Sequence, residues 1–385
     1  MTTSDSRPST IRRSWTFAAA AAIASLVILT GCGSSDSSTS TGSGSGSDRA
    51  GIAKAESATK AAAAGPDEKF EVAALKTTPP AGKTVAFVVC NLPACGPESV
   101  DAPAATLKWK RNIYLYDLSK GPQDFVRALD AAIAAEPDYL IVQQSFPAAV
   151  SAKEIKLAAD KKIPYVTVGA ALDDPKLDAL VTAGILSPKT WSAQGALAAK
   201  ATLAMSGKPT EVLVPYDPTI NSMTATISGL QDTFKQLSPG TKVELLEESF
   251  GAPQTTTVAQ TINFLRTHPK VEYVMFPGGT ALSAGIAQAL KTNGMSSKVK
   301  IVLLSLTTDK NIESLKSGEA AIGIGFIADF GWQAVDLLAR LSAGEELASK
   351  TPTVPTRVIT RETATLDALN PPNYQTVYKK AWGVK

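Results

Sequence analysis

Two cysteines, Cys90 and Cys95, have the spacing that most suggests chemistry in this chain of 385 residues. They lie in the stretch VVCNLPACGP, directly after an apolar run. Two thiols five positions apart could close a small disulfide loop. They could also contribute to a zinc site, but such sites usually take four cysteine or histidine ligands. Which chemistry applies depends on the compartment in which the chain is found.

The N-terminus indicates export. Residues 1–14 carry three arginines, Trp15–Leu29 is almost purely apolar, and LTGC closes the run at Cys32. This order is typical of a secretion signal, and the run is shorter than the roughly 20 apolar residues of a membrane span. The four letters resemble the bacterial lipobox, in which the cysteine is lipidated and becomes the first mature residue. We therefore expect a signal peptide over 1–31 and a lipid on Cys32; the alternative is an ordinary signal with a chance cysteine.

Export puts the other two cysteines in an oxidising compartment. We expect Cys90 and Cys95 to form a disulfide, with Pro93 inside the loop. The alternative is that Cys90 is a free thiol buried at the end of a strand. A metal site is not expected, because the mature domain offers only these two thiols and one histidine.

Few other residues suggest catalysis. The single histidine, His268, precedes a proline and is typical of a turn, and without a second histidine no histidine-based triad or zinc cluster can form. The acid pairs Asp173-Asp174 and Glu247-Glu248 are adjacent in sequence, which favours a solvated surface. No glycine-rich stretch has the strand-Gly-x-Gly-x-x-Gly-helix layout of a dinucleotide site. We expect no enzyme activity, no catalytic residue and no cofactor.

Residues 32–82 are predicted to be a flexible linker. The part up to Asp48 is glycine, serine and threonine with nothing to bury. The alanine-rich part that follows ends in Pro79-Pro80 and shows no amphipathic stripe. Without residues 1–31 the chain has 35 basic and 34 acidic side chains, so no basic surface for nucleic acid is implied.

Beyond Lys83, short apolar runs alternate with amphipathic ones. The runs are too short for helices and too continuously apolar for a half-exposed sheet, which is typical of buried parallel strands. A first series holds expected strands at 84–90, 112–116, 139–142 and 165–168 and expected helices at 122–136 and 152–164; a second, similar series begins near Ser192. Two such series predict an α/β fold with two doubly wound parallel-sheet lobes.

The order of these segments resembles the type I periplasmic binding proteins of the ribose-binding and sugar ABC-transporter group. The resemblance covers about 83–361 and is carried by co-linear motifs such as ALDAAIAAEPDYLIVQ, AADKKIPYVTV, TINFLRTHPKVEYVMF and IESLKSGEAAIGI. It implies three crossings between lobes, near Leu186–Trp191, Gly325–Phe326 and Val354–Arg357. The lobes would be 83–188 plus 326–355, and 189–325 plus 356–385.

Ligands of open α/β sheets bind at the carboxyl ends of the strands, so candidate binding residues follow each expected strand or lie at a crossing. Each of them could instead be a packing or turn residue. The candidates are Asn91, Gln143, Gln144, Phe146, Trp191, Tyr216, Asn221, Gly279, Thr280, Leu306 and Phe326.

The resemblance also points to a difference in ligand. Where the sugar-binding members grip hydroxyl groups with charged and amide side chains, this chain has Phe146, Thr224, Gly279-Thr280, Leu306 and Gly325. A sugar would leave hydroxyls unpaired at about 1–3 kcal/mol each. We expect a less hydroxylated ligand with an apolar body, not a simple sugar. The alternative is a different register, with a sugar held by other polar side chains.

The expected function is that of a lipid-anchored substrate-binding protein on the extracytoplasmic face of the cell membrane. It would capture a small molecule between two lobes and deliver it to an ABC permease. The alternative is a sensor that docks on a membrane receptor and signals the ligand without importing it. We expect a monomer with no nucleic-acid partner.

Overall fold

The computed structural model describes residues 46–65, 70–92, 95–169, 174–249, 252–277, 284–306 and 309–384, and all of them belong to one compact unit. Within these ranges no helix is long and apolar enough to cross a membrane. The expected signal peptide, Cys32, Gly279 and Thr280 lie outside the described residues.

The first sheet has five parallel strands in the order β2-β1-β3-β4-β5. They are β1 (Thr84–Cys90), β2 (Lys110–Tyr116), β3 (Tyr139–Gln143), β4 (Tyr165–Val168) and β5 (Ala183–Ile185). The connecting helices are α2 (Asp101–Thr106), α3 (Pro122–Ala134), α4 (Ala152–Asp160) and α5 (Pro175–Asp178), with short 3-10 turns at Leu118–Lys120 and Ala148–Ser151. In this order the chain reverses direction across the sheet between β1 and β3, which is where open sheets leave a crevice at their carboxyl ends.

Strand β1 shows why the run TVAFVVC is apolar throughout. Val85, Phe87 and Val89 pack on one face of the sheet, in a core shared with α2 and α12 (Phe330–Ser342). Ala86 and Val88 pack on the other face, in a core shared with α3 and α4. Because both faces are covered, every side chain after Thr84 is buried.

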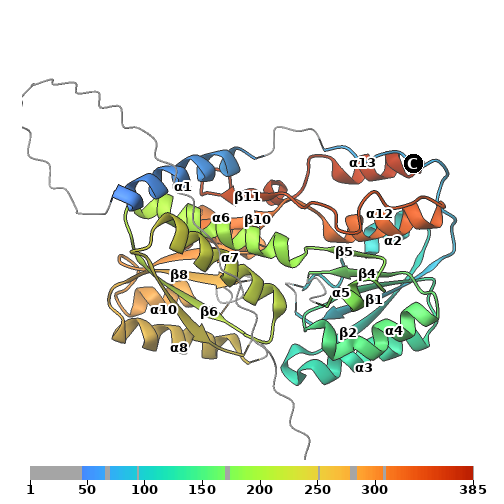
Figure 1. Ribbon diagram of the computed structural model, residues 1–385, viewed down its shortest axis with the longest axis horizontal. Coiled ribbons are helices and arrows are strands. Elements are labelled where there is room, and N and C mark those ends of the chain that lie inside the picture. The colour runs from blue at the N-terminus through green and yellow to red at the C-terminus, as the bar shows by residue number, and fades with distance from the viewer. Residues whose placement is uncertain are drawn as a thin grey trace, which may run out of the picture. The chain divides into compact units, whose positions relative to one another are not determined.

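The second sheet has six strands in the order β11-β10-β9-β8-β6-β7. They are β6 (Glu211–Tyr216), β7 (Lys242–Glu247), β8 (Val271–Pro277), β9 (Lys300–Leu304), β10 (Ile322–Phe326) and β11 (Thr356–Ile359), which alone among them is antiparallel. The helices that connect them are α7 (Asn221–Leu237), α8 (Gln254–Thr267), α10 (Ile286–Thr292) and α11 (Asp309–Ser317). The two doubly wound sheets confirm the predicted fold class (Figure 1).

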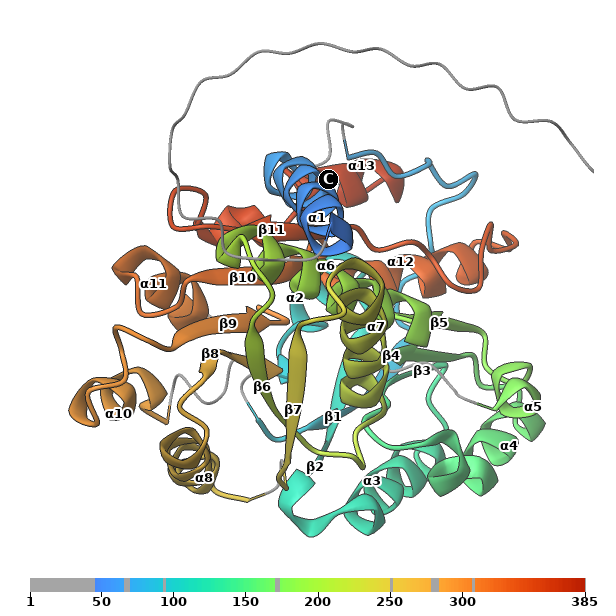
Figure 2. The ribbon, with the colours of Figure 1, turned by 60° about the vertical axis from the view of Figure 1, so that its left-hand side comes forward.

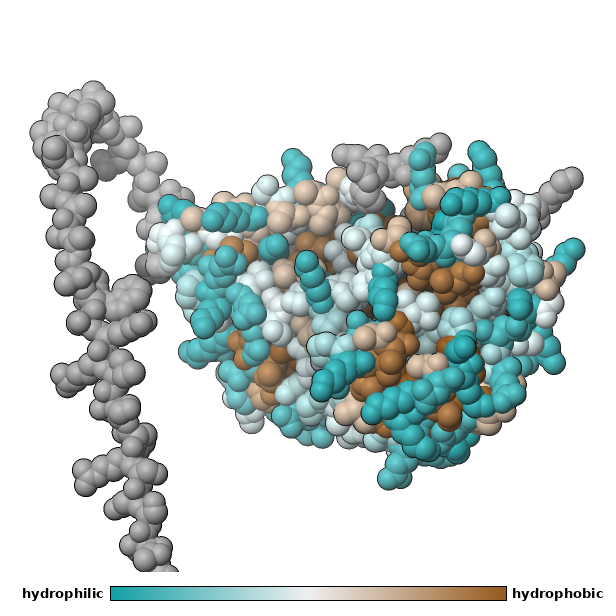
Figure 3. Space-filling view, turned by 45° about the vertical axis from the view of Figure 1, so that its right-hand side comes forward, coloured by the Kyte–Doolittle hydropathy of each residue, from teal (hydrophilic) through white to brown (hydrophobic). Residues whose placement is uncertain are grey.

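The chain passes between the sheets at three segments. It leaves β5 to enter α6 (Pro188–Ser206), leaves β10 to enter α12, and returns after α12 to β11. Helix α6 packs closely along α7, and the two helices run side by side in both ribbon views (Figures 1 and 2). Hydrophilic residues cover most of the face in Figure 3, with hydrophobic patches between them.

The linker prediction is wrong for residues 46–64. They form helix α1 (Gly46–Ala64), which packs on α6, α7 and β11 (Figure 1). The helix buries Gly51, Ile52 and Ala55 on one side. Its packing face consists mainly of small residues, which is why no bulky apolar stripe marks it in the sequence.

The predicted place of the C-terminal tail is also different in the structure. After β11 and a short turn at Leu366–Leu369, helix α13 (Tyr374–Ala381) packs on α12 and so belongs with the first sheet. Trp382 has no exposed surface and stacks on Trp332 with ring centroids 5.2 Å apart. Its indole nitrogen donates a hydrogen bond to Asp336 over 2.8 Å. These large aromatic contacts, distant in sequence, hold the tail on the first lobe.

Candidate functional site

A cavity of about 460 Å³ lies at the carboxyl ends of strands from both sheets. The first sheet contributes Gln143 and Val168, the last residues of β3 and β4, and the second contributes Pro277 and Leu304, the last residues of β8 and β9. The cavity also reaches the segments that connect the sheets, at Leu186 and Phe326 among others. A molecule bound in it would therefore touch both lobes.

The walls of the cavity are mostly apolar. Leu306 fills the place beside Gly323, where an added Cβ would lie 2.7 Å from its nearest side-chain atom. Leu369 fills the place beside Gly325 in the same way, at 2.1 Å. The position that a side chain at residue 325 would take is thus occupied by a leucine that is distant in sequence. Other apolar lining residues are Phe87, Leu118, Ile141, Ile220, Met223 and Ile312.

Three aromatic rings form one corner of the cavity. Trp191, in the first turn of α6, meets Phe326 edge to face with ring centroids 4.9 Å apart. Phe330, at the start of α12, meets Phe326 at 6.0 Å, also edge to face. The indole nitrogen of Trp191 donates to the carbonyl of Gly169 over 2.7 Å, which fixes the ring from the first lobe. The corner therefore joins the two crossings that sequence reasoning expected near the site.

Hydrogen bonds hold the polar side of the first lobe in place. The backbone nitrogen of Cys90 donates to the Gln143 side-chain oxygen over 3.1 Å. The Tyr116 hydroxyl donates to the Gln143 carbonyl over 3.0 Å and shares a 2.6 Å hydrogen bond with Ser145. Burial raises the pKa of Tyr116, so this hydroxyl stays protonated. Gln143 and Ser145 thus line the cavity as neutral polar residues that hydrogen bonds hold in place.

The loop after β1 carries the expected disulfide. The sulfur atoms of Cys90 and Cys95 are bonded in the structure. Cys90 is fully buried at the strand end, and Cys95 and the residues that follow it, Gly96, Glu98 and Ser99, line the cavity. The disulfide therefore anchors one wall of the cavity to the core of the first sheet.

Asp329, at the start of α12, contributes a carboxylate to the wall of the cavity. Asp329 caps the helix by accepting from the Trp332 backbone nitrogen over 3.1 Å, and the Tyr374 hydroxyl donates to its other oxygen over 3.1 Å. Burial raises the pKa of Asp329. Among the described residues no cluster of histidine, cysteine and carboxylate side chains could hold a metal ion.

The model of the family described as "Periplasmic binding protein domain" matches residues 98–346, more than half of the chain. This chain belongs to the periplasmic binding protein family. The resemblance seen in its sequence is thereby confirmed, and the fold is that of type I members. No curated protein sequence matches the chain.

Solved structures similar to this periplasmic binding protein show the same fold. A 5-methylthioribose transporter solute-binding protein from Thermotoga lettingae, in complex with 5-methylthioribose, is 18% identical, with a TM-score of 0.66 over 80% of this chain and 99% of the other. A carbohydrate transporter solute-binding protein from Agrobacterium radiobacter, in complex with D-arabinose, is 19% identical, with a TM-score of 0.64 over 75% and 98%. GanP, a glucose-galactose binding protein from Geobacillus stearothermophilus, is 19% identical, with a TM-score of 0.62 over 74% and 100%.

In this periplasmic binding protein the cavity brings together five of the residues expected from sequence. They are Gln143, Gln144, Trp191, Leu306 and Phe326. The side chain of Gln144 is fully buried, and its amide nitrogen donates to the carbonyl of Phe146 over 2.8 Å. Gln144 therefore shapes the loop after β3, and its amide is already engaged there.

Four expected residues do not line the cavity. Phe146 is 4% exposed and packs in the core between Tyr116 and Phe125, because the loop after β3 turns back over α3. Asn91 is exposed and hydrogen-bonds to Asp117 at the end of the neighbouring strand. The two others, Tyr216 and Asn221, lie at the β6 end and the α7 start; the Tyr216 hydroxyl donates to Glu247 over 3.2 Å.

Sequence reasoning missed several lining residues. Ile220 directly precedes the expected Asn221 at the α7 start and Met223 follows it by two positions, so a shift in register of one or two positions would have found them. Phe330 follows the expected crossing at Phe326 by four residues. Leu369 carries no local signal, since it reaches the cavity only through the fold of the C-terminal tail.

Proposed function

We propose that this protein captures a small solute between its two lobes and delivers it to an ABC importer. It would do so on the extracytoplasmic face of the membrane, held there by a lipid on Cys32. The observation that carries the proposal is the cavity built from the strand ends of both sheets. Its volume of about 460 Å³ falls within the range of small-molecule pockets, roughly 300–1,000 Å³.

The position of the cavity supplies a mechanism for signalling occupancy to an importer. A solute there contacts both lobes only when they are closed around it. Its binding free energy therefore shifts the equilibrium between open and closed forms toward the closed form. An importer that recognises the closed form would accept the loaded protein in preference to the empty one.

We further propose that the solute has an apolar body and few hydroxyl groups. The described lining offers extensive apolar surface, from Leu306, Leu369 and the Trp191 corner. Polar groups form the smaller part of the lining and include neutral side chains such as Gln143 and three carboxylates. A similar protein was solved with 5-methylthioribose, a pentose in which a methylthio group replaces one hydroxyl. Others were solved with simple sugars, for example D-arabinose, so sugars belong in the same test.

The test is a thermal-shift panel. D-arabinose, D-fucose, D-allose, 5-methylthioribose and small aromatic and aliphatic alcohols are compared at equal concentration. A ligand at 100 times its Kd adds about 2.7 kcal/mol to the free energy of unfolding, which raises Tm by several degrees. Stabilisation by 5-methylthioribose or an aromatic alcohol supports the proposal. Stabilisation by a free monosaccharide at micromolar concentration, with no stabilisation by the apolar compounds, contradicts it.

A further inference from the structure

The charged residues that line the cavity, among those that the structure describes, are all acidic. They are Glu98 in the loop after the disulfide, Asp309 at the start of α11 and Asp329 at the start of α12. No described lysine, arginine or histidine lines it. The residues that separate the described ranges between 95 and 384 contain no lysine, arginine or histidine in their sequence either.

The acidic residues come from both lobes and differ in burial. Glu98 and Asp309 are exposed, whereas Asp329 is partly buried and already accepts two hydrogen bonds. Because Glu98 lies in the first lobe and Asp309 in the second, an approaching solute meets negative charge on both sides. A cleft lined by charge of one sign concentrates its field inside the cleft, where the walls are of low dielectric constant.

An anionic solute would find no opposite charge among the described residues of this cavity. Burying an unpaired carboxylate or phosphate is strongly unfavourable, and repulsion from the acidic residues adds to this cost. A cation would meet the opposite conditions, because Trp191, Phe326 and Phe330 line the cavity and aromatic rings attract positive charge through their π electrons. The acidic residues and the aromatic corner therefore both favour a cation over an anion.

We propose that the cavity selects solutes by charge, admitting cationic and neutral molecules and excluding anions. This inference rests on the proposed function for the identity of the site. It narrows the solute to an organic cation or a neutral molecule with an apolar body. Acidic sugars, sugar phosphates and aromatic acids are excluded as solutes.

Fluorescence quenching of Trp191 tests the charge of the cavity without knowledge of the solute. Of the described tryptophans, Trp191 is partly exposed, whereas Trp109, Trp332 and Trp382 are at most 5% exposed. The difference in signal between the protein and its Trp191→Phe variant isolates this residue. Its quenching constants for N-methylpyridinium, acrylamide and iodide are measured at low salt and compared with those of free N-acetyltryptophanamide.

We divide the quenching constant of N-methylpyridinium by that of iodide. We expect this ratio to be severalfold higher for Trp191 than for free N-acetyltryptophanamide. The ratio should fall toward that of the free compound at 1 M salt, where the Debye length is about 3 Å. Glu98→Gln with Asp309→Asn should lower the ratio, whereas the control Glu319→Gln, an exposed residue beyond the far end of α11, should not.

Iodide quenching equal to or stronger than that of the cation overturns the inference, and so does a ratio that the double variant leaves unchanged. Stabilisation of the protein by phenylacetate, compared in the thermal-shift panel with 2-phenylethanol and 2-phenylethylamine, overturns it as well. If no solute in the panel binds but the quenching ratio is high, the solute-binding proposal is weakened while the charge of the cavity is confirmed.

A separate observation concerns the segment before the first strand. Helix α1 lies on the second lobe, so close that a Cβ on Gly51 would fall 1.7 Å from the Leu237 carbonyl oxygen at the end of α7. Near the other end of the helix, the Arg357 guanidinium donates to the carbonyl of Ala63 over 3.4 Å. Arg357 belongs to β11, so α1 is attached to the sheet edge that follows the third crossing.

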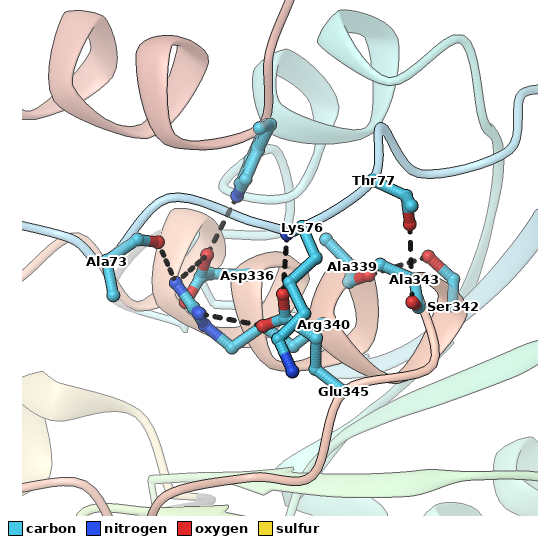
Figure 4. A network of polar contacts seen from close by, with 10 residues as sticks. Ala73, Lys76, Thr77, Asp336, Ala339, Arg340, Ser342, Ala343 and Glu345 are labelled. Atoms are coloured by element: carbon cyan, nitrogen blue, oxygen red, sulfur yellow. Dashed lines mark hydrogen bonds and ion pairs between the residues drawn. The ribbon is translucent and has the colours of Figure 1, made fainter.

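The residues after this helix lie on the first lobe instead. Figure 4 shows the Arg340 guanidinium donating to the carbonyl of Ala73, over 2.7 Å, and the Lys76 backbone nitrogen donating to Glu345, also over 2.7 Å. The Leu75 nitrogen donates to the carbonyl of Ala381 over 2.8 Å. Arg340 also pairs with Asp336, so the segment is attached to a partly buried ion pair of α12.

We propose that residues 46–65 and 70–77, each held on a different lobe, act together as a strap that limits how far the lobes open. Residues 46–65 and 70–77 are held by different lobes, and five residue steps join Gly65 to Phe70, a reach of at most about 18 Å. Opening beyond that reach requires one end to leave its lobe. The strap thus adds a fourth connection to the three crossings.

The strap is tested by cutting it in the folded protein. A specific protease site replaces residues 66–69, and the radius of gyration of the unliganded protein is measured by solution scattering before and after cleavage. We expect the radius to rise on cleavage while the helical circular dichroism stays unchanged. An unchanged radius overturns the proposal.

A second measurement uses two alanine variants of the same helix. Gly51→Ala should increase hydrogen exchange in α1 several-fold, because the methyl group meets the Leu237 carbonyl. Gly46→Ala should not, since nothing lies within 4 Å of its Cβ position. If Gly51→Ala leaves exchange in α1 unchanged, α1 is not held on the second lobe as proposed.

Discussion

Replacing Gly195 by alanine should loosen the wall of the cavity that α6 and α7 form together. A Cβ on Gly195 would lie 1.9 Å from the Thr226 carbonyl oxygen, and a Cβ on Gly229 would lie 1.9 Å from the Ser192 carbonyl oxygen. The two helices thus approach each other through a reciprocal pair of glycines. Real Cβ atoms essentially never come closer than 3.0 Å to a neighbour, so Gly195→Ala must move the helices apart by roughly 1 Å.

The expected cost follows from two opposing effects. Overpacking of a tight contact costs about 1–3 kcal/mol. Alanine gains up to about 1 kcal/mol over glycine in helix propensity, which offsets part of that cost. We expect the free energy of unfolding to fall by about 1–2 kcal/mol. With a urea m-value of about 3 kcal/mol per molar, the midpoint should fall by about 0.3–0.7 M.

Urea unfolding followed by circular dichroism measures this change. Ala193→Gly is the matched control, because Ala193 is exposed on the same helix and its replacement reports the difference in helix propensity without a packing contact. Gly195→Ala should also weaken binding of any solute found in the thermal-shift panel, since Trp191 and Met223 lie on the two separated helices. A Gly195→Ala midpoint equal to or above that of the unmodified protein would refute the reasoning from close helix contact.

Three further predictions concern acid stability, the disulfide and the anchor. A hydrogen bond from Arg127 lowers the pKa of Asp124 from 3.8 to about 2, so its stabilising effect is present above 3.8 and lost as the pH falls through 2. In the Asp124→Asn variant the urea midpoint should therefore fall less across that pH range than in the unmodified protein. An equal fall in both proteins would contradict this. Mass analysis should find Cys90 and Cys95 alkylated only after reduction; alkylation of the native protein would show free thiols. Cys32→Ala should release the protein from the membrane fraction of its host cells, and retention there would rule out the lipid anchor.

The alternation of strands and helices could be predicted from the sequence because it depends on local pattern. TVAFVVC is apolar at every position and became β1, buried on both faces. The expected helix at 122–136 became α3, with Phe125, Leu129 and Ile133 on its buried face. The same local pattern locates the ends of the strands. Gln143, the last residue of β3, could therefore be predicted to lie at the cavity.

Contacts between distant residues were decided only by the tertiary structure. Phe146 follows the same strand as Gln143, yet its ring lies in the core, because the loop that carries it turns back over α3. Leu369 enters the cavity from the C-terminal tail, and α1 packs through the backbone at Gly51. The physical reason is that periodicity reports which faces of an element are buried, whereas the partner of each face, and the direction of a side chain on a loop, depend on which distant segments can pack there without voids or steric overlap.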